Sequence, residues 1–221
     1  MNEIVKFSDH EVSPWQAYAD DVLASAIAGD MLKFVKGDWL RGEGDTAVPS
    51  DAMFIANMEE VWTGWVRWFD GNPAEHRISR LIDRAPKLLR EDLGYLDKAV
   101  WESNPDGTLR DPWAQTDRVV MKDDVNGELV TFVTGSYGGR WALARLLRTY
   151  ARDHARQEGR FPVVTLGVDK TWKHDKFGTI PRPLFNVIGW SFWDNDAAAS
   201  GAKAIEAPAS TAAKLNDEIP F

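Results

Sequence analysis

The sequence predicts a mostly β protein with helices, of the α+β class, whose strands close or nearly close into an antiparallel barrel. Three observations support this fold. Short runs rich in Val, Ile, Thr and aromatic residues recur between Gly, Asn, Asp and Pro turn signals. Only two segments have the three-and-four spacing of apolar residues that is typical of an amphipathic helix. Two β-rich runs joined through Asn126 and Gly127 have the composition of a hairpin.

An N-terminal helix is predicted from its start signals and its periodicity. Ser13 is a suitable N-cap, and Pro14 occupies the first helical position. Apolar residues then recur at helical spacing from Trp15 to Ile27, and Gly29 provides a stop. We therefore expect an amphipathic helix of about four turns here, packed on the core.

The expected strands and a second helix follow along the chain. Residues 118–122 and 128–134 form the predicted hairpin, and a basic helix is expected from Arg140 to about Gln157. Residues 79–113 contain three prolines and are expected to form a helix or a long loop. Five to seven short strands with two main helices favour an OB-like antiparallel barrel. The other strands are expected at residues 31–39, 52–58, 62–69, 163–168, 169–177 and 184–192.

The acidic net charge is concentrated at the two ends of the chain. The 221 residues carry a net charge of −8 and include 11 tryptophans. Residues 1–30 carry −5 and residues 194–221 carry −3, so that residues 31–193 are neutral. Within the neutral part, residues 140–182 contain ten basic and four acidic side chains. The acidic sum therefore leaves room for a basic surface that binds nucleic acid.

Several classes of protein are excluded or disfavoured by composition and motifs. The absence of cysteine excludes disulfides, thiolate catalysis and cysteine-based zinc sites. No phosphate-binding loop, zinc-protease helix or dinucleotide fingerprint occurs, and the four histidines lack ligand spacing. Thr134 to Gly138 resembles a hydrolase nucleophile elbow around Ser136, but a Thr replaces the first glycine. No catalytic residue, metal ligand or cofactor is predicted, and no apolar run is long enough to span a membrane.

The chain is expected to comprise one domain over residues 1–193 and a flexible tail over residues 194–221. From Asp194 to Asn216 the tail is rich in alanine and has no aromatic residue, so it cannot form a core of its own. It finishes with two acidic residues and an apolar end: Asp217, Glu218, Ile219, Pro220 and Phe221. A Phe ring beside a terminal carboxylate offers a partner one apolar group and one anion.

This ending resembles the acidic C-terminal tip of bacterial single-stranded DNA-binding proteins, in which a run of aspartates precedes Ile-Pro-Phe. The resemblance covers about the last six residues, and Asn216 and Glu218 stand where aspartate is common. The body of the chain does not align with that family. The resemblance implies that residues 217–221 recruit enzymes of replication, repair and recombination.

Three segments of the body combine cations with aromatic side chains, as binding of single strands without sequence preference requires. Two of them are expected strands, in which alternation places the cations and rings on one face. The third is the basic helix, whose arginines recur at three and four residues beside a tryptophan. The predicted DNA-binding residues are Trp65, Arg67, Phe69, Arg140, Trp141, Arg145, Arg148, Arg152, Lys170, Trp172, Lys173 and Lys176.

These observations favour a single-stranded DNA-binding protein of a bacterium or phage. We expect it to coat single strands during replication or recombination in the bacterial cytoplasm, and to recruit partner enzymes through its tip. A homo-oligomer is compatible with the sequence. Two alternatives remain open at this point: an adaptor that binds only protein, and a DNA-processing enzyme such as a nuclease.

Overall fold

The computed structural model describes residues 27–104, 107–175 and 178–193. The predicted N-terminal helix, apart from Ile27, lies outside the described residues. Lys176 and the whole tail lie outside them as well, including the predicted partner-binding residues Asp217, Glu218, Ile219, Pro220 and Phe221. Within these described ranges, no helix has the length and apolar composition needed to cross a membrane.

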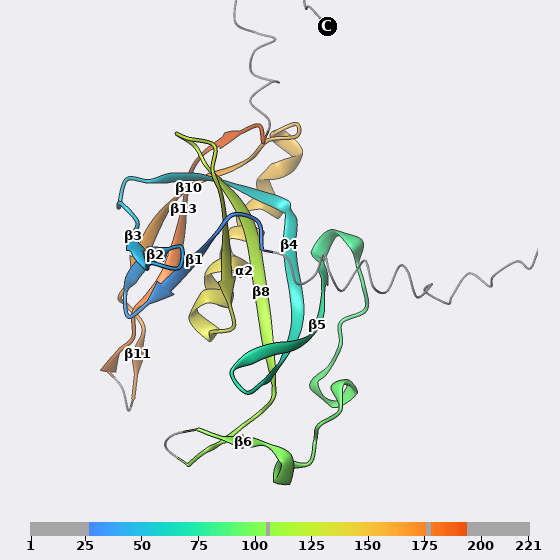
Figure 1. The fold of residues 1–221 in the computed structure, drawn as a ribbon. Helices are drawn as coiled ribbons and strands as arrows, with labels where there is room; N and C mark the ends of the chain where they lie inside the picture. The colour runs from blue at the N-terminus through green and yellow to red at the C-terminus, as the bar shows by residue number, and fades with distance from the viewer. Residues whose placement is uncertain (1–26, 105–106, 176–177, 194–221) are drawn as a thin grey trace, which may run out of the picture.

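The described residues are mostly β, with one α-helix, and a nine-stranded mixed sheet curls into a half-barrel (Figure 1). Strand β5 (Asn72–Arg80) pairs with β4 beside the main path of the sheet. Along that path the strands are β13 (Arg182–Ser191), β10 (Phe161–Asp169), β4 (Met53–Phe69), β8 (Trp113–Asp123), β9 (Leu129–Thr134), β1 (Asp30–Val35), β2 (Asp38–Arg41) and β3 (Thr46–Ala47).

The structure confirms a mostly β, barrel-like fold of the α+β class. The prediction that all strands pair antiparallel is wrong for one pair. Strands β1 and β9 pair in parallel, with Asp30 opposite Val130 and Leu32 opposite Phe132. The OB fold itself is not confirmed by this strand order. The parallel pairing joins segments about 100 residues apart, and no local pattern in the sequence indicates it.

Strand β4 is the longest strand and lies in the middle of the sheet. It pairs with β10 at its start, with β8 over most of its length and with β5 over its second half. The pairing with β8 jumps from Ala56 to Val61 while β8 advances only from Met121 to Val119, and such an irregularity bends a strand. The two strands predicted at 52–58 and 62–69 are therefore one bent strand.

Helix α2 (Tyr137–Asp153) confirms the predicted basic helix, and the short helix η4 (His154–Arg156) continues it. The Ser136 side chain caps it by accepting a hydrogen bond from the Gly139 amide at 3.1 Å. A Cβ atom at Gly139 would lie 2.0 Å from Thr134 Oγ1, so the first turn packs directly on the end of β9. The helix lies beside β13 and closes the open side of the half-barrel (Figure 1). Its buried residues Ala142, Leu143 and Leu146 share one core cluster with Val119, Phe132 and Phe185 of the sheet.

Trp39 links two strands that are distant in the order of the sheet. Its indole Nε1, on β2, donates a hydrogen bond to the Gly167 carbonyl of β10 at 2.9 Å. Its ring lies 5.4 Å from the Phe132 ring and 5.5 Å from the Phe185 ring. Only 6% of Trp39 is exposed, so these contacts are made in the core. They hold the sheet in its curled form.

Several predicted boundaries need correction. The hairpin of β8 and β9 is confirmed, but the strand expected at 31–39 is divided by a turn at Lys36 and Gly37. The strand expected at 169–177 is largely wrong: among its described residues, Asp169 ends β10 and Lys173–His174 (β11) pairs with Gly178–Thr179 (β12). The described part of residues 79–113 contains three short 3-10 helices and a small strand pair: η1 (Leu81–Asp83), η2 (Arg90–Leu93), η3 (Lys98–Val100), β6 (Glu102–Ser103) and β7 (Leu109–Arg110).

The variant Trp39→Phe tests the link between β2 and β10. Loss of the indole donor leaves the Gly167 carbonyl without this bond, and we expect the free energy of unfolding in urea to fall by about 1–2 kcal/mol. Trp101→Phe is a matched control, because Trp101 Nε1 also donates to a carbonyl, that of Tyr95 at 2.8 Å, but at an exposed site. Equal losses in the two variants would contradict a special role for Trp39.

Candidate nucleic-acid interface

Five planar side chains beside the start of α2 form a continuous series of ring and guanidinium contacts, here called the stacking ladder. Tyr137 lies 6.0 Å from Trp172 between ring centroids. The Arg182 guanidinium lies 5.5 Å from the Trp172 ring and 4.1 Å from the Trp141 ring. The Arg145 guanidinium lies 4.8 Å from the Trp141 ring and completes the ladder. Such cation–π contacts favour a fixed arrangement of flat groups.

Three of the five ladder residues come from one stripe of α2. Tyr137, Trp141 and Arg145 are spaced four residues apart, which places them on the same side of the helix. The prediction that Trp141 lies next to the arginine stripe is therefore confirmed by the Arg145 contact. Trp172 and Arg182 come from the segment between β10 and β13 and from the first residue of β13. The ladder thus joins α2 to the edge of the sheet.

Asp169, the last residue of β10, holds Arg182 in the ladder. Its Oδ2 atom lies 2.6 Å from Arg182 Nη2, and about a tenth of each side chain is exposed. Its Oδ1 atom accepts hydrogen bonds from the Thr171 hydroxyl at 2.6 Å and the Thr171 amide at 2.8 Å. The hydroxyl bond first, then the amide bond and Arg182, lower the pKa of Asp169 to about 2. The carboxylate is therefore ionised at neutral pH.

Arg182 uses its flat faces rather than all of its hydrogen-bond donors. Its Nε atom is buried and has no hydrogen-bond partner among the described residues. The guanidinium instead contacts the rings of Trp141 and Trp172 while one terminal nitrogen meets Asp169. The ion pair with Asp169 and the two ring contacts therefore position the Arg182 guanidinium within the ladder.

A groove of about 520 Å³ opens beside the ladder. Tyr137 is 66% exposed at its edge, while Trp172 is only partly exposed. Lys36 contributes a cation to the groove, and the exposed Lys170 and Lys173 flank Trp172 in the chain. The groove is lined by Phe34, Lys36, Ser136, Tyr137, Gly138, Trp172, Thr179, Ile180, Pro181, Arg182 and Pro183.

The predicted arginines of α2 divide into two groups. Arg145, Arg148 and Arg152 are exposed along the stripe that begins at Tyr137. Among the described residues no carboxylate forms an ion pair with Arg145 or Arg148, whereas Arg152 pairs with Asp153 at 2.7 Å. Arg140 lies apart from the ladder, because its Nε atom pairs with Asp117 of β8 at 3.3 Å.

The predicted face of β4 is used mainly for contacts within the protein. Trp65 and Arg67 do lie on one face, but Trp65 Nε1 donates to the Leu88 carbonyl at 3.1 Å. Arg67 pairs with Glu75 at 3.2 Å and lies 4.9 Å from the Tyr95 ring. Phe69, at the end of the strand, is 66% exposed. Of the three, only Phe69 offers a largely open ring.

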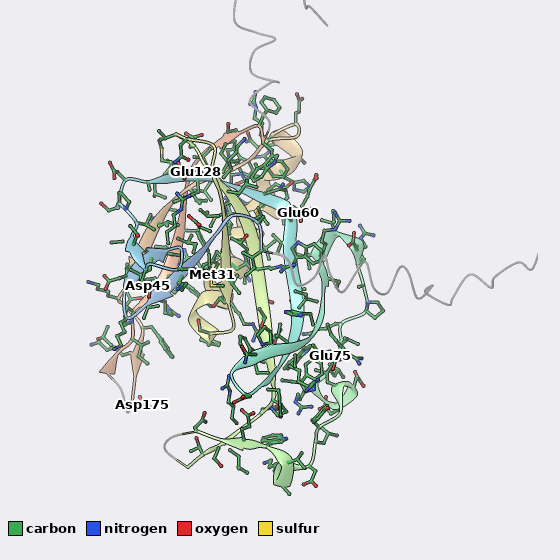
Figure 2. The ribbon with its side chains drawn as sticks, viewed as in Figure 1. Met31, Asp45, Glu60, Glu75, Glu128 and Asp175 are labelled. Atoms are coloured by element: carbon green, nitrogen blue, oxygen red, sulfur yellow. The ribbon has the colours of Figure 1, made fainter. Side chains whose placement is uncertain are left out.

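The two predicted faces are separated in space. Figure 2 labels Asp175 in the β11–β12 hairpin, which follows Trp172, and Glu75 on β5, beside Arg67. The two labels lie at opposite sides of that view. The structure therefore brings Trp141, Arg145 and Trp172 together and leaves Trp65, Arg67 and Phe69 on another part of the molecule.

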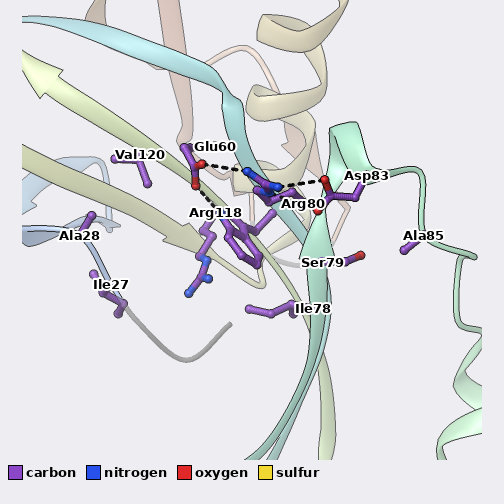
Figure 3. A pocket seen from close by; sticks show the side chains of 11 residues that line it. Ile27, Ala28, Glu60, Ile78, Ser79, Arg80, Asp83, Ala85, Arg118 and Val120 are labelled. Carbon is purple, nitrogen blue, oxygen red and sulfur yellow. Dashed lines mark hydrogen bonds and ion pairs between the residues drawn. The ribbon is translucent and has the colours of Figure 1, made fainter. Parts of the chain in front are cut away.

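Sequence reasoning missed a larger pocket on the outer side of β4, β5 and β8 (Figure 3). It has a volume of about 680 Å³ and is lined in part by Arg80 and Arg118. Arg118 is 5% exposed and lies 4.6 Å from the Trp62 ring, whose Nε1 donates to Glu60 at 3.0 Å. Burial lowers the pKa of Arg118, and Glu60 opposes this change. The only sequence signal was a basic residue, Arg118, directly before the apolar run from Val119 to Met121.

The chain matches no protein-family model, and no curated protein or solved structure is significantly similar to it. Among the residues that the structure describes, no three His, Asp or Glu side chains form a group that could hold a metal ion.

The variant Asp169→Asn tests how the ladder is held. At neutral pH we expect a lower melting temperature, because Arg182 loses its anionic partner. A lowered pKa means that the stabilising effect is full above about pH 4 and disappears as the pH falls toward about 2. The difference in melting temperature between the native protein and Asp169→Asn should therefore narrow over this range.

Asp175→Asn is the control for this experiment, because Asp175 is an exposed carboxylate in the neighbouring hairpin. It should leave the melting temperature unchanged at each pH. A constant difference between the native protein and Asp169→Asn from about pH 4 to about pH 2 would show that the ionised Asp169 is not the stabilising group.

Proposed function

We propose that this protein binds single-stranded DNA through the stacking ladder and the arginine stripe of α2, and coats it during replication or recombination. The observation that carries the proposal is the position of the exposed Tyr137 ring and the exposed Arg145 and Arg148 on one side of one helix. Stacking on aromatic rings is worth about 1–3 kcal/mol per base and does not depend on sequence. Arginines supply the contacts to phosphate.

The preference for single strands follows from what the face offers. A ring such as Tyr137 can stack only on a base whose own face is free, as in an unpaired strand. The groove beside it has a volume of only about 520 Å³, and aromatic and proline side chains line much of it rather than a broad basic surface. We propose that the half-barrel serves as an OB-like platform, in which the curled sheet supports this binding face.

The acidic segment from Asp217 to Phe221 completes the proposal as a recruiting element. Its support is the resemblance to the tip of bacterial single-stranded DNA-binding proteins. In the sequence, the 23 residues from 194 to 216 separate this segment from the body. Binding of DNA and of partner enzymes would then use different parts of the chain.

An adaptor that binds only protein is the second candidate, and a specific observation favours it. Five large apolar side chains, each about half exposed or more, lie on or next to the segment of residues 81–110. They are Phe69, Tyr95, Leu96, Val100 and Leu109. Exposed apolar groups in one region are typical of protein-interaction surfaces. This candidate predicts that the native protein does not bind oligonucleotides.

Titration with oligo-dT tests the proposed function. We expect tryptophan emission to fall on binding, because Trp141 and Trp172 lie in the ladder. For about three phosphate contacts, affinity should fall roughly twentyfold between about 50 and 200 mM salt, because binding releases counterions. Duplex of the same length is the control and should bind more weakly. Absence of binding at low salt would contradict the proposal, and degradation of DNA with divalent metal would indicate a nuclease.

Deletion of Ile219 to Phe221 tests the recruiting element. We expect the binding of oligo-dT to be no weaker, because the deletion leaves every predicted DNA-binding residue in place. Co-purification of replication and repair enzymes should be lost. A deletion of Ala197 to Ala199 in the linker is the matched control and should retain them. If co-purification survives removal of the last three residues, the tip has no recruiting role.

A further inference from the structure

The binding face of α2 is not uniform from one end to the other. Its N-terminal half presents rings, with Tyr137 at the outer end of the ladder and Trp141 behind it. Its C-terminal half presents the cations Arg148 and Arg152. Arg145 lies between the halves, because it contacts the Trp141 ring and is itself exposed. A single-stranded DNA lying along the helix would therefore meet two different chemical surfaces, one after the other.

The aromatic end is suited to a single base. Tyr137 is 66% exposed on α2, and Trp172 supports it at 6.0 Å with an angle of 37° between the rings. A ring pair at this distance and tilt leaves no parallel gap for a base, so the available surface is the outer face of Tyr137. The adjoining groove of about 520 Å³ gives room for one nucleotide and contains the cation of Lys36.

The basic end is suited to the sugar-phosphate backbone. Residues three or four positions apart on a helix have Cβ atoms about 5–6 Å apart, a spacing on the scale of one nucleotide in an extended strand. Arg145 and Arg148 have this spacing and form no ion pair with a described carboxylate. Arg152 follows one turn later but shares its charge with Asp153. The strongest phosphate contacts should therefore lie next to the aromatic end.

We propose that the site binds single-stranded DNA in one direction, with one anchor base stacked on Tyr137 and the phosphates that follow bound by Arg145 and Arg148. This inference rests on the proposed function and adds to it the register of the strand. One stacked base followed by phosphates at Arg145 and Arg148, with Arg152 one turn beyond, corresponds to about four nucleotides, at the lower end of the range for single-strand-binding domains.

The test uses oligonucleotides of about five thymidines in which one abasic position is moved stepwise from the 5′ to the 3′ end. For the native protein we expect about a tenfold loss of affinity when the abasic position coincides with the anchor base, and a much smaller loss at other positions. Tyr137→Ala should remove this dependence on position, whereas Tyr137→Phe should retain it.

Two further variants locate the site. Arg148→Ala should weaken binding equally at every abasic position and lower the salt dependence by about one phosphate contact. Tyr95→Ala should have no effect, although Tyr95 is 50% exposed and lies 4.9 Å from an arginine, because it lies on the separate face beside Arg67. An effect of Tyr95→Ala equal to that of Tyr137→Ala would overturn the assignment to α2.

The outcomes for the anchor base and for the proposed function are distinct. Tight binding of the intact oligonucleotide with an equal loss at every abasic position would overturn the directional site and leave single-strand binding intact. The same conclusion follows if Tyr137→Ala retains the positional dependence of the native protein. Failure of the native protein to bind the intact oligonucleotide would overturn both proposals.

Discussion

The contact of Trp39 with Gly167 and with two buried rings is the constraint on which the rest of the structure depends. Four strands separate β2 from β10 in the order of the sheet, so only strong curvature brings them within hydrogen-bond distance. The same curvature leaves a space that α2 fills beside β13. Arg182 at the start of β13 thereby meets Trp141 of α2. The stacking ladder is thus a product of the curvature of the sheet.

The distribution of ion pairs explains why one face of a neutral domain can bind an anion. Arg67, Arg80 and Arg140 are each paired with a carboxylate of the neighbouring strands or turns. Arg145 lies against a ring instead, and Arg148 has no ion-pair partner among the described residues. A ring leaves the charge of a guanidinium available to a further partner, whereas a carboxylate neutralises it. The position of the charges therefore matters more than their sum.

The sequence predicts what local signals determine. The hairpin around Asn126 and Gly127 and the basic helix were both predicted, because turn chemistry and helical periodicity act over a few residues. Two separate strands were predicted at 52–58 and 62–69, but pairing with β8 continues past the bend and makes them one strand. Trp141 and Trp172 could be selected from their neighbours in the chain. The contact of both rings with Arg182 could not be predicted from the sequence, because it depends on tertiary packing.

The parallel pairing of β1 with β9 has a consequence for the order in which the chain folds. The β8–β9 hairpin closes a short loop, whereas the pairing of Asp30 with Val130 closes a loop of about 100 residues. Closure of the longer loop costs more chain entropy before any contact compensates for it. The first described strand therefore joins the sheet late, after the hairpin that provides its edge. During synthesis, an early segment must wait for a partner made much later, with its apolar residues exposed meanwhile.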